Sequence, residues 1–294
     1  MFYYYELTTN FKFLCQYNVA SIFAFRAMNT AKHKNIGGGL QPLTSLSKGL
    51  GLLLLLREAS NSMTLSEISR AAGLHKVTTL RLLITLEKFH FVERNREAKT
   101  FEIGKNAFYV GNGFARKGPR QKILEVMTGL VRRCHHTVTL SILDGASVLF
   151  VERLDGTARV KVTVDIGSRV PAYCSATGRA LLAGLTDKQI IERFRGKRLG
   201  RFVDGTPATI GKLLADVAKV RSRGFAVNDQ QSAPGLVAIA VPVKNHRGEH
   251  VAALGMAFPA GSLKKDGQKR LTGILLEAAK EIEAFGIESW RTMS

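Results

Sequence analysis

Basic and hydroxyl-bearing side chains gather at the start of one predicted helix, which spans residues 76–88. Lysine and arginine donate hydrogen bonds to phosphates and to guanine edges, and threonine hydroxyls bond to either. Valine can contact the methyl group of thymine. These side-chain types predict contact with base edges in double-stranded DNA, and the candidates are Lys76, Val77, Thr78, Thr79 and Arg81.

The segment before this helix has the features of a helix-turn-helix. Thr64 is a good N-cap, and Glu67 three residues later completes a capping box. Gly73 then supplies the permissive backbone that a tight turn needs. DNA-binding proteins of this kind read bases with the first turns of the second helix. Thr64 and Ser66 are further candidates for DNA contact, and an ordinary helical hairpin with solvated charges is the alternative.

A predicted β-hairpin follows the second helix. Residues 89–93 and 101–103 can form two strands around a polar turn. Leucines at helical spacing precede the motif, so the complete winged helix-turn-helix domain is predicted over 43–104. Cations near the tip of the hairpin would lie beside phosphates, which position a protein on DNA without reading sequence. These cations are Arg94, Arg96 and Lys99.

The charge balance fits a polyanionic partner. The 294 residues include 43 lysines and arginines against 23 acidic residues, which gives a net charge of +20. Such a balance favours nucleic acid through counterion release. Most of the excess lies outside the winged module, because residues 118–294 carry +11. The motif therefore locates the DNA-binding face better than the charge does.

Cysteine usage and hydropathy indicate the compartment. Three cysteines without paired spacing argue against a disulfide framework and fit a reducing, cytoplasmic location. No apolar run reaches the roughly 18 residues that a membrane-spanning helix needs. We therefore expect neither a membrane span nor a membrane partner.

The first 42 residues are predicted to be a poorly structured extension. Residues 1–27 are rich in aromatics without a helix or strand period, and they lack the basic start and cleavage site of a signal peptide. We expect Met28 to be the natural start and residues 29–42 to be a flexible lead-in. Binding of this extension to a membrane surface is the alternative.

Strand patterns dominate the second half of the chain, after a predicted linker helix over 105–119. Antiparallel strands with helices to one side indicate an α+β domain over 120–288. The predicted helices cover 120–134, 176–183, 187–194, 209–223 and 266–286. The predicted strands cover 137–143, 148–154, 159–164, 225–228, 237–244 and 250–258.

Cys174 is a candidate nucleophile in this domain. A nucleophilic cysteine needs a base nearby, and His246 and His250, in or beside a predicted hairpin turn, are the candidates. A cysteine-dependent small-molecule enzyme that uses Cys174 is therefore an alternative function. Residues 134–136 (Cys-His-His) would point to opposite faces of an extended strand, so they cannot converge on one ion. We expect no metal and no cofactor.

The loop 173–178 (YCSATG) and a strand over 252–258 indicate a ligand site instead. Backbone N–H groups where a helix begins attract carboxylates, so the loop predicts a small organic acid. The strand is bulky on one face and small on the other, and the small face either leaves room for a ligand or packs closely against a helix. The small residues are Ala253, Gly255, Ala257 and, on the partner strand, Ala238 and Ala240.

Four motifs in this order resemble the IclR family of bacterial transcriptional regulators, over residues 43–288. They are SLSKGLGLLLLLREA, TLSEISRAAGLHKVTTLRLLITLEKFHFVER, IGSRVPAYCSATGRALLA and GFAVNDQQSAPGLVAIAVPV. The segments VPAYCSATGRALL and DQQSAPGLVAIAVPV look most like the branch that controls aromatic-acid and β-ketoadipate catabolism.

The resemblance implies a winged helix-turn-helix, a linker helix and a GAF-like effector domain. Lys76, Thr78 and Arg81 match the family's recognition helix, whereas Val77 replaces a hydroxyl residue and Leu80 replaces an aromatic one. Small apolar residues at family pocket positions imply a bulkier or more aromatic ligand than a two- or three-carbon acid. With the loop, the implied effector site comprises Tyr173, Cys174, Ser175, Ala176, Thr177, Gly178, Asn228, Asp229, Ala238, Gly255 and Ala257.

The expected function is effector-responsive control of transcription. Two subunits of a dimer or tetramer would place recognition helices in major grooves of a palindromic operator. A small organic acid, aromatic or dicarboxylic, would shift the population between arrangements with different operator affinity. Besides the enzyme, a constitutive architectural DNA binder with a purely structural second domain is an alternative.

Overall fold

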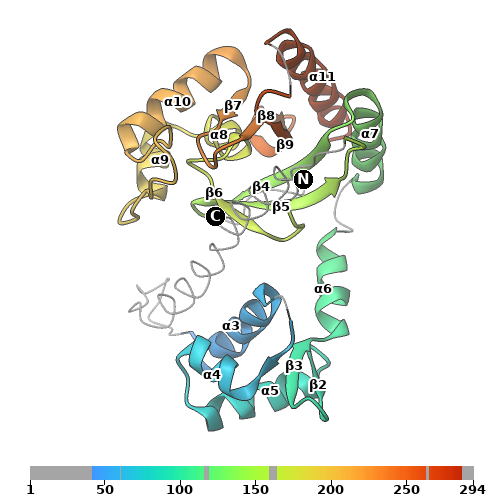
Figure 1. Cartoon of the computed structure of the whole chain (residues 1–294), viewed down its shortest axis with the longest axis vertical. Coiled ribbons are helices and arrows are strands. Elements are labelled where there is room, and N and C mark those ends of the chain that lie inside the picture. The colour runs from blue at the N-terminus through green and yellow to red at the C-terminus, as the bar shows by residue number, and fades with distance from the viewer. Residues whose placement is uncertain (1–41, 60, 116–118, 159–163, 263–264, 287–294) are drawn as a thin grey trace, which may run out of the picture. The chain divides into compact units, whose positions relative to one another are not determined.

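The protein forms two compact units that divide between Arg116 and Lys117 (Figure 1). The computed structural model describes residues 42–59, 61–115, 119–158, 164–262 and 265–286. The predicted extension over 1–42 and the Met28 start therefore lie outside the described residues, apart from Pro42.

The smaller unit packs three helices and a three-stranded antiparallel sheet around one apolar core. Leu52, Ile68 and Leu83 each come from a different helix and are fully buried. They share the core with Phe101 of the sheet, whose strand order is β1-β3-β2. Its elements are α3 (Thr44–Glu58), β1 (Met63–Thr64), α4 (Leu65–Ala72), α5 (Lys76–Lys88), β2 (Val92–Asn95) and β3 (Thr100–Ile103).

The wing begins later than its sequence predicts. Residues 89–91 form the end of α5 and a turn, because Phe89 caps the helix and His90 has a positive φ of 55°. The aromatic ring of Phe89 is exposed rather than packed in a strand. The polar turn follows the prediction, since the Asn95 side chain accepts hydrogen bonds from the backbone N–H groups of Glu97 and Ala98.

The predicted linker helix is present as α6 (Lys105–Ala115). Its first turn is tied to the end of α5: the Asn106 side chain donates to the Phe89 carbonyl at 2.8 Å, and its backbone N–H donates to the His90 carbonyl at 3.0 Å. Residues 116–118, at the predicted end of the linker, lie outside the described part of the chain.

A six-stranded antiparallel sheet organises the larger unit, with the order β6-β5-β4-β9-β8-β7. The hairpins predicted around Asp144–Ser147 and around 245–248 are both present. The strands are β4 (Thr137–Asp144), β5 (Ser147–Leu154), β6 (Arg169–Pro171), β7 (Ala226–Asp229), β8 (Leu236–Lys244) and β9 (His250–Pro259).

Helices cover both faces of this sheet, not one face as the sequence suggests (Figure 1). The bulky residues of β9, such as Leu254 and Met256, face a core formed with α7 and α11. Ala240 and Ala253 face a second core formed with α8, α9 and α10. The helices are α7 (Arg120–Cys134), α8 (Ala176–Leu182), α9 (Asp187–Arg193), α10 (Ile210–Arg223) and α11 (Lys265–Glu283).

The sheet edge differs from the prediction in one strand. Most of the strand expected over 159–164 lies outside the described residues. The edge strand that the structure describes is β6, which pairs with Ser147, Val148 and Leu149 of β5. Three residues are too few to form an alternating pattern, so β6 could not be predicted from the sequence. No helix among the described residues is both long and apolar enough to cross a membrane.

Candidate DNA-binding and effector sites

The exposed face of α5 carries four of the five side chains predicted to read bases. Lys76, Thr78 and Arg81 are exposed, and Val77 is 62% exposed. An apolar residue this open on a short helix is available for a contact that the unit itself does not supply. Gly73 is left-handed at the end of α4 (φ 64°), as a tight turn between the two helices requires.

Thr79 is the exception, and its prediction as a DNA contact is wrong. Its side chain is 0% exposed and lies on the core face of α5, one helical turn from Leu83. Its hydroxyl donates to the His75 carbonyl at 3.2 Å, so the only polar group is satisfied inside the helix. A buried group with this partner cannot reach a base.

Thr64 and Glu67 form the predicted capping box. The Thr64 backbone N–H donates to the Glu67 carboxylate at 2.8 Å, and the Glu67 backbone N–H donates to the Thr64 hydroxyl at 3.4 Å. The Thr64 hydroxyl also donates to this carboxylate at 2.8 Å, and the two bonds that Thr64 donates to the charged group lower the pKa of Glu67. Ser66 is exposed at the start of α4, whereas Thr64 is half-buried and committed to the cap.

The three predicted wing cations are all exposed. Arg94 lies on β2 with its guanidinium 5.3 Å from the centre of the Phe101 ring, which fixes its direction. Arg96 lies in the turn, and Lys99 ends it with a positive φ of 55°. This placement suits contact with a phosphate backbone.

The loop 173–175 is held closely by the rest of the larger unit. The Tyr173 hydroxyl donates to the Gly200 carbonyl at 2.8 Å, and its ring is buried against Phe194 and Phe202. Ser175 caps α8 by accepting the Gly178 backbone N–H at 3.0 Å. This cap already satisfies one of the backbone N–H groups that are predicted to bind the carboxylate of a small acid.

Cys174 lacks the properties of a nucleophile. The side chain is 3% exposed, and its Sγ donates to the Pro171 carbonyl at 3.4 Å. Burial raises the pKa of the Cys174 thiol to about 12, although Arg179 opposes the shift. Neither predicted base serves it: His246 lies in the β8–β9 turn, and His250 donates from Nδ1 to the Ala180 carbonyl at 2.9 Å.

Residues 134–136 do not lie on one strand, so the prediction that their side chains point to opposite faces of a strand is wrong. Cys134 ends α7, and His135 is the left-handed cap of that helix with a φ of 60°. Burial raises the pKa of the Cys134 thiol and lowers the pKa of His136. The His135 ring bonds to the hydroxyl of Thr157 at 3.0 Å.

Asn228 joins β7 to the loop 173–175. Its side-chain amide donates to the Cys174 carbonyl at 3.2 Å and to the Ser232 hydroxyl at 2.7 Å, and its oxygen accepts the Gln231 backbone N–H at 2.8 Å. Because its polar atoms are engaged and the residue is buried, Asn228 positions this loop. Asp229 next to it is exposed.

Helix α8 lies directly on the small face of β9. A Cβ added at Gly255 would lie 2.6 Å from Thr177 Cγ2 and 3.2 Å from Thr139 Oγ1. Close packing against a helix is therefore the reason for the glycine, and no cavity lies at this position. Buried Arg179 helps to fix the helix, since its guanidinium donates to the Val227 carbonyl at 2.8 Å and faces Asp216 at 3.5 Å.

The small face opens one row further along the sheet. Ala238 and Ala257 lie opposite each other and are partly exposed, although both belong to central strands. The same row continues to Asn228 on β7 and to Thr137 on β4. The sequence reasoning missed the hydroxyl residues of β4 on this face, although their alternation with apolar residues was a visible signal. They are Thr137, Thr139 and Ser141.

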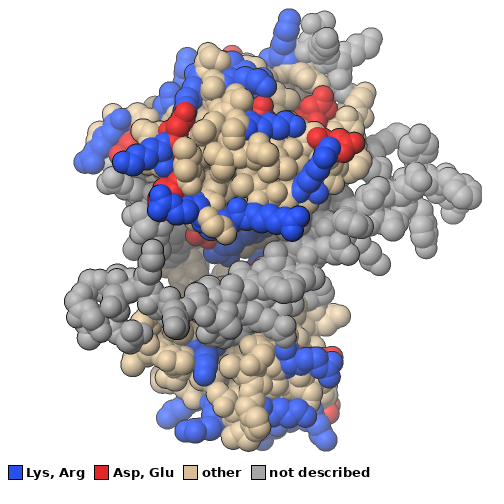
Figure 2. All heavy atoms as spheres, turned by 90° about the vertical axis from the view of Figure 1, so that its left-hand side faces the viewer, with Lys and Arg blue, Asp and Glu red and all other residues tan. Residues whose placement is uncertain are grey.

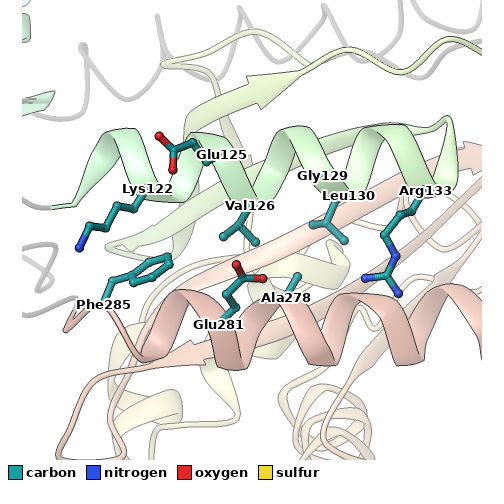
Figure 3. Close-up of a pocket in the computed structure, with 9 residues that line it drawn as sticks. All are labelled: Lys122, Glu125, Val126, Gly129, Leu130, Arg133, Ala278, Glu281 and Phe285. Carbon is teal, nitrogen blue, oxygen red and sulfur yellow. The ribbon is translucent and has the colours of Figure 1, made fainter.

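A groove of about 210 Å³ lies between α7 and α11 and is separate from the predicted effector residues (Figure 3). Charged side chains of both signs surround an apolar floor, and the Lys122 ammonium lies 5.4 Å from the centre of the Phe285 ring. This mixture indicates no particular ligand. The lining residues are Lys122, Glu125, Val126, Gly129, Leu130, Arg133, Ala278, Glu281 and Phe285.

Comparison with known families identifies both units. Residues 117–284 match the bacterial transcriptional regulator IclR C-terminal family, which covers more than half of the chain. The chain belongs to the IclR family. Residues 45–96 match the IclR helix-turn-helix domain, so this IclR-family protein is a DNA-binding transcriptional regulator and not an enzyme.

Curated relatives match this IclR-family chain over nearly their full length. The transcriptional repressor IclR of Escherichia coli is 29% identical over 246 residues, which cover 82% of this chain and 90% of the relative. The Pca regulon regulatory protein of Pseudomonas putida is 27% identical over 252 residues, which cover 83% and 85%.

Solved structures share the fold. An IclR regulator from Alicyclobacillus acidocaldarius has a TM-score of 0.75 at 24% identity and covers 83% of this chain and 99% of its own. An IclR homologue from Microbacterium hydrocarbonoxydans, solved in complex with 4-hydroxybenzoate, has a TM-score of 0.71 at 24% identity and covers 82% and 98%. The order of a helix-turn-helix and an α+β domain is common to all of them.

Proposed function

We propose that this regulator binds a palindromic operator as a dimer or larger oligomer in the cytoplasm, and that a small organic acid changes its operator affinity. The exposed face of α5 is the observation that supports operator recognition. Its side chains face solvent and take no part in the core of their unit: Lys76, Val77, Thr78 and Arg81. The wing cations add phosphate contacts beside it.

Alanine substitutions on α5 test this face. We expect Lys76→Ala and Arg81→Ala each to lower operator affinity by about 1–3 kcal/mol if the side chain reads a base edge. Lys88→Ala, at the far end of the same helix, is the matched control and should change the affinity little. Equal binding by parent, Lys76→Ala and Arg81→Ala in a footprinting titration would remove α5 as the reading helix.

The wing requires a different measurement. Arg96→Ala should weaken binding to all sequences alike and should reduce the dependence of the affinity on salt, because a phosphate contact carries no sequence information. A selective loss at one base pair would instead assign Arg96 to base reading.

Self-association is supported by a leucine stripe along α3 and its N-cap residue, which we define as Leu43, Leu46, Leu50 and Leu54. All four are more than half exposed and recur at helical spacing on one face, while Leu52, Leu55 and Leu56 on the opposite side form the core. A patch this apolar on the unit that reads DNA is suited to a second copy of the same surface. Two copies joined here would present two recognition helices, as a palindrome requires.

The proposed effector site lies between the loop 173–178 and the row of Ala238 and Ala257. Partial exposure of these alanines on central strands supports it, as does the small size of their side chains. The Pca regulon relative and the 4-hydroxybenzoate complex favour an aromatic acid.

Filling the row tests the effector site. A panel of aromatic and dicarboxylic acids should raise the melting temperature of the parent, and Ala257→Leu should abolish that rise while operator affinity is kept. Ala284→Leu, at an exposed position just after the end of α11, is the control. Thr177→Val keeps the shape that packs on Gly255 and should weaken an acid by about 0.5–1.5 kcal/mol if the hydroxyl holds the carboxylate. No response of the parent to any acid would favour an architectural DNA binder.

A further inference from the structure

A dense group of cations lies on the larger unit, in the loop that joins α9 to α10. We define the cationic loop as residues 195–201; it contains Arg195, Lys197, Arg198 and Arg201 and no acidic residue. All four side chains are exposed. Residues 187–223 as a whole carry +6 of the +11 that residues 118–294 contain. Figure 2 looks onto the face formed by α9 and α10, where lysine and arginine side chains outnumber acidic ones.

The fold holds the backbone of this loop in place. The Gly200 carbonyl accepts the Tyr173 hydroxyl at 2.8 Å, and the Phe202 ring stacks on the Tyr173 ring with centroids 6.1 Å apart. The buried Thr206 hydroxyl accepts the Phe202 and Val203 backbone N–H groups and donates to the Gln231 carbonyl at 2.7 Å. The cations therefore extend from an ordered support, so a partner would not have to order the loop on binding.

Neighbouring arginines serve the fold, whereas the loop cations do not. Arg221 donates to the Ala183 and Leu185 carbonyls at the end of α8, and Arg193 donates to the Gly145 carbonyl. Lys197 and Arg198, in contrast, form no ion pair with any residue that the structure describes.

The other two loop cations have weak partners. Arg195 pairs with Glu192 at 2.5 Å and Arg201 pairs with Asp204 at 2.8 Å, and both pairs are largely exposed. Exposed ion pairs contribute about 0–1 kcal/mol and are screened by salt, so a polyanion can displace them. The positive charge of the cationic loop is therefore not required by the fold and is available to bind an external anion.

We propose that the cationic loop binds the phosphate backbone of double-stranded DNA next to the operator. The proposal goes beyond the function proposed above and uses only the DNA-binding activity of the family. The duplex is a polyanion that the protein already holds, with about one charge per 1.7 Å of axis. The loop presents lysines and arginines but no ordered set of amide or hydroxyl groups that could recognise base edges. We therefore expect it to contact phosphates without sequence specificity.

Charge reversal with a matched control tests the proposal. The variant Lys197→Glu/Arg198→Glu is compared with Lys269→Glu/Arg270→Glu, an adjacent exposed pair on α11 of the same unit. Each full-length protein is titrated with a short duplex of about 20 base pairs, near the minimum for two half-sites one turn apart, and with a duplex about three times longer.

We expect Lys197→Glu/Arg198→Glu to lose about tenfold in affinity for the long duplex and little for the short one. The slope of log affinity against log salt on the long duplex should fall by about 2, since each phosphate contact contributes about 0.9. Lys197→Arg/Arg198→Lys should bind like the parent, and the α11 variant should show no difference between the two duplexes. An unchanged melting temperature establishes that the variant is folded.

Two results would overturn the proposal. Equal losses for the loop and α11 variants would show that net charge alone matters, and parental affinity on both duplexes would show that the loop serves another partner. Failure of base reading is distinguishable, because Arg81→Ala should weaken binding to both duplexes alike.

Discussion

The thiol of Cys174 shows how burial decides the chemistry of one residue. Because burial raises the pKa of the Cys174 thiol to about 12, almost all molecules carry the neutral thiol at pH 8. We expect iodoacetamide to leave Cys174 unlabelled in the native protein at pH 8 and to label it fully in denaturant, as read by peptide mass spectrometry. Rapid native labelling at Cys174 would contradict this burial.

His250 should make the larger unit sensitive to acid. Burial lowers the pKa of His250, and Lys244 and Arg221 lower it further, while the bond to the Ala180 carbonyl opposes the shift. Below the usual pKa of about 6.5 the unfolded chain binds a proton that the folded chain does not. The stability is therefore complete above that pH and falls as the pH drops toward the folded pKa.

The measurement compares parent and His250→Gln. We expect the loss of melting temperature between pH 7.5 and pH 5.5 to be smaller in His250→Gln, because glutamine does not titrate. His136, whose pKa burial also lowers, contributes equally to both proteins and cancels. The same pH dependence in both would mean that His250 does not contribute.

At the scale of elements, the contact between α8 and β9 gives a stability prediction. Gly255→Ala places a Cβ against the Thr177 methyl, and overpacking of this kind costs about 1–3 kcal/mol. Thr177→Ser removes that methyl, so Gly255→Ala/Thr177→Ser should recover part of the loss in urea unfolding. Gly273→Ala on α11, where an added Cβ meets nothing within 4 Å, should be neutral or stabilising. Additive effects of the Gly255 and Thr177 changes would exclude the contact.

Local signals explain which elements the sequence could predict. The cap at Thr64, the left-handed Gly73 and the polar turn at Asn95 depend on neighbours within a few residues, and all three are present as predicted. The orientation of α5 was harder. Polarity alone would bury Val77 and expose Thr79, but the structure does the reverse because the Thr79 hydroxyl finds its partner inside the helix.

Contacts between distant segments explain what the sequence could not predict. The small face of β9 fitted a cavity or a helix equally well, and only the position of α8 decides the matter at Gly255. The role of Asn228 depends on Cys174, 54 residues earlier in the chain. The split of helices over both sheet faces likewise arises from packing that no local pattern encodes.

At the scale of the whole molecule, the leucine stripe of α3 predicts how copies assemble. We expect Leu50→Glu to shift the protein toward monomers in light scattering, because a buried charge in the interface has no partner. Operator affinity should then fall by about 10²–10⁴, the gain that joining two binding modules provides. Ile191→Glu, an exposed apolar residue on α9, is the control. An unchanged mass for Leu50→Glu would place the interface elsewhere.

The hydroxyl of Tyr173 joins the loop proposed to hold an acid to the loop proposed to hold DNA. Thermodynamic linkage is reciprocal. If a bound acid changes the DNA affinity by some factor through this bond, bound DNA must change the acid affinity by the same factor. Tyr173→Phe keeps the ring stacking and removes the bond, so the coupling should shrink while each ligand still binds alone. Acid titrations with and without the long duplex measure it. Through one hydrogen bond, DNA bound at the cationic loop would then change the affinity of the regulator for its own effector.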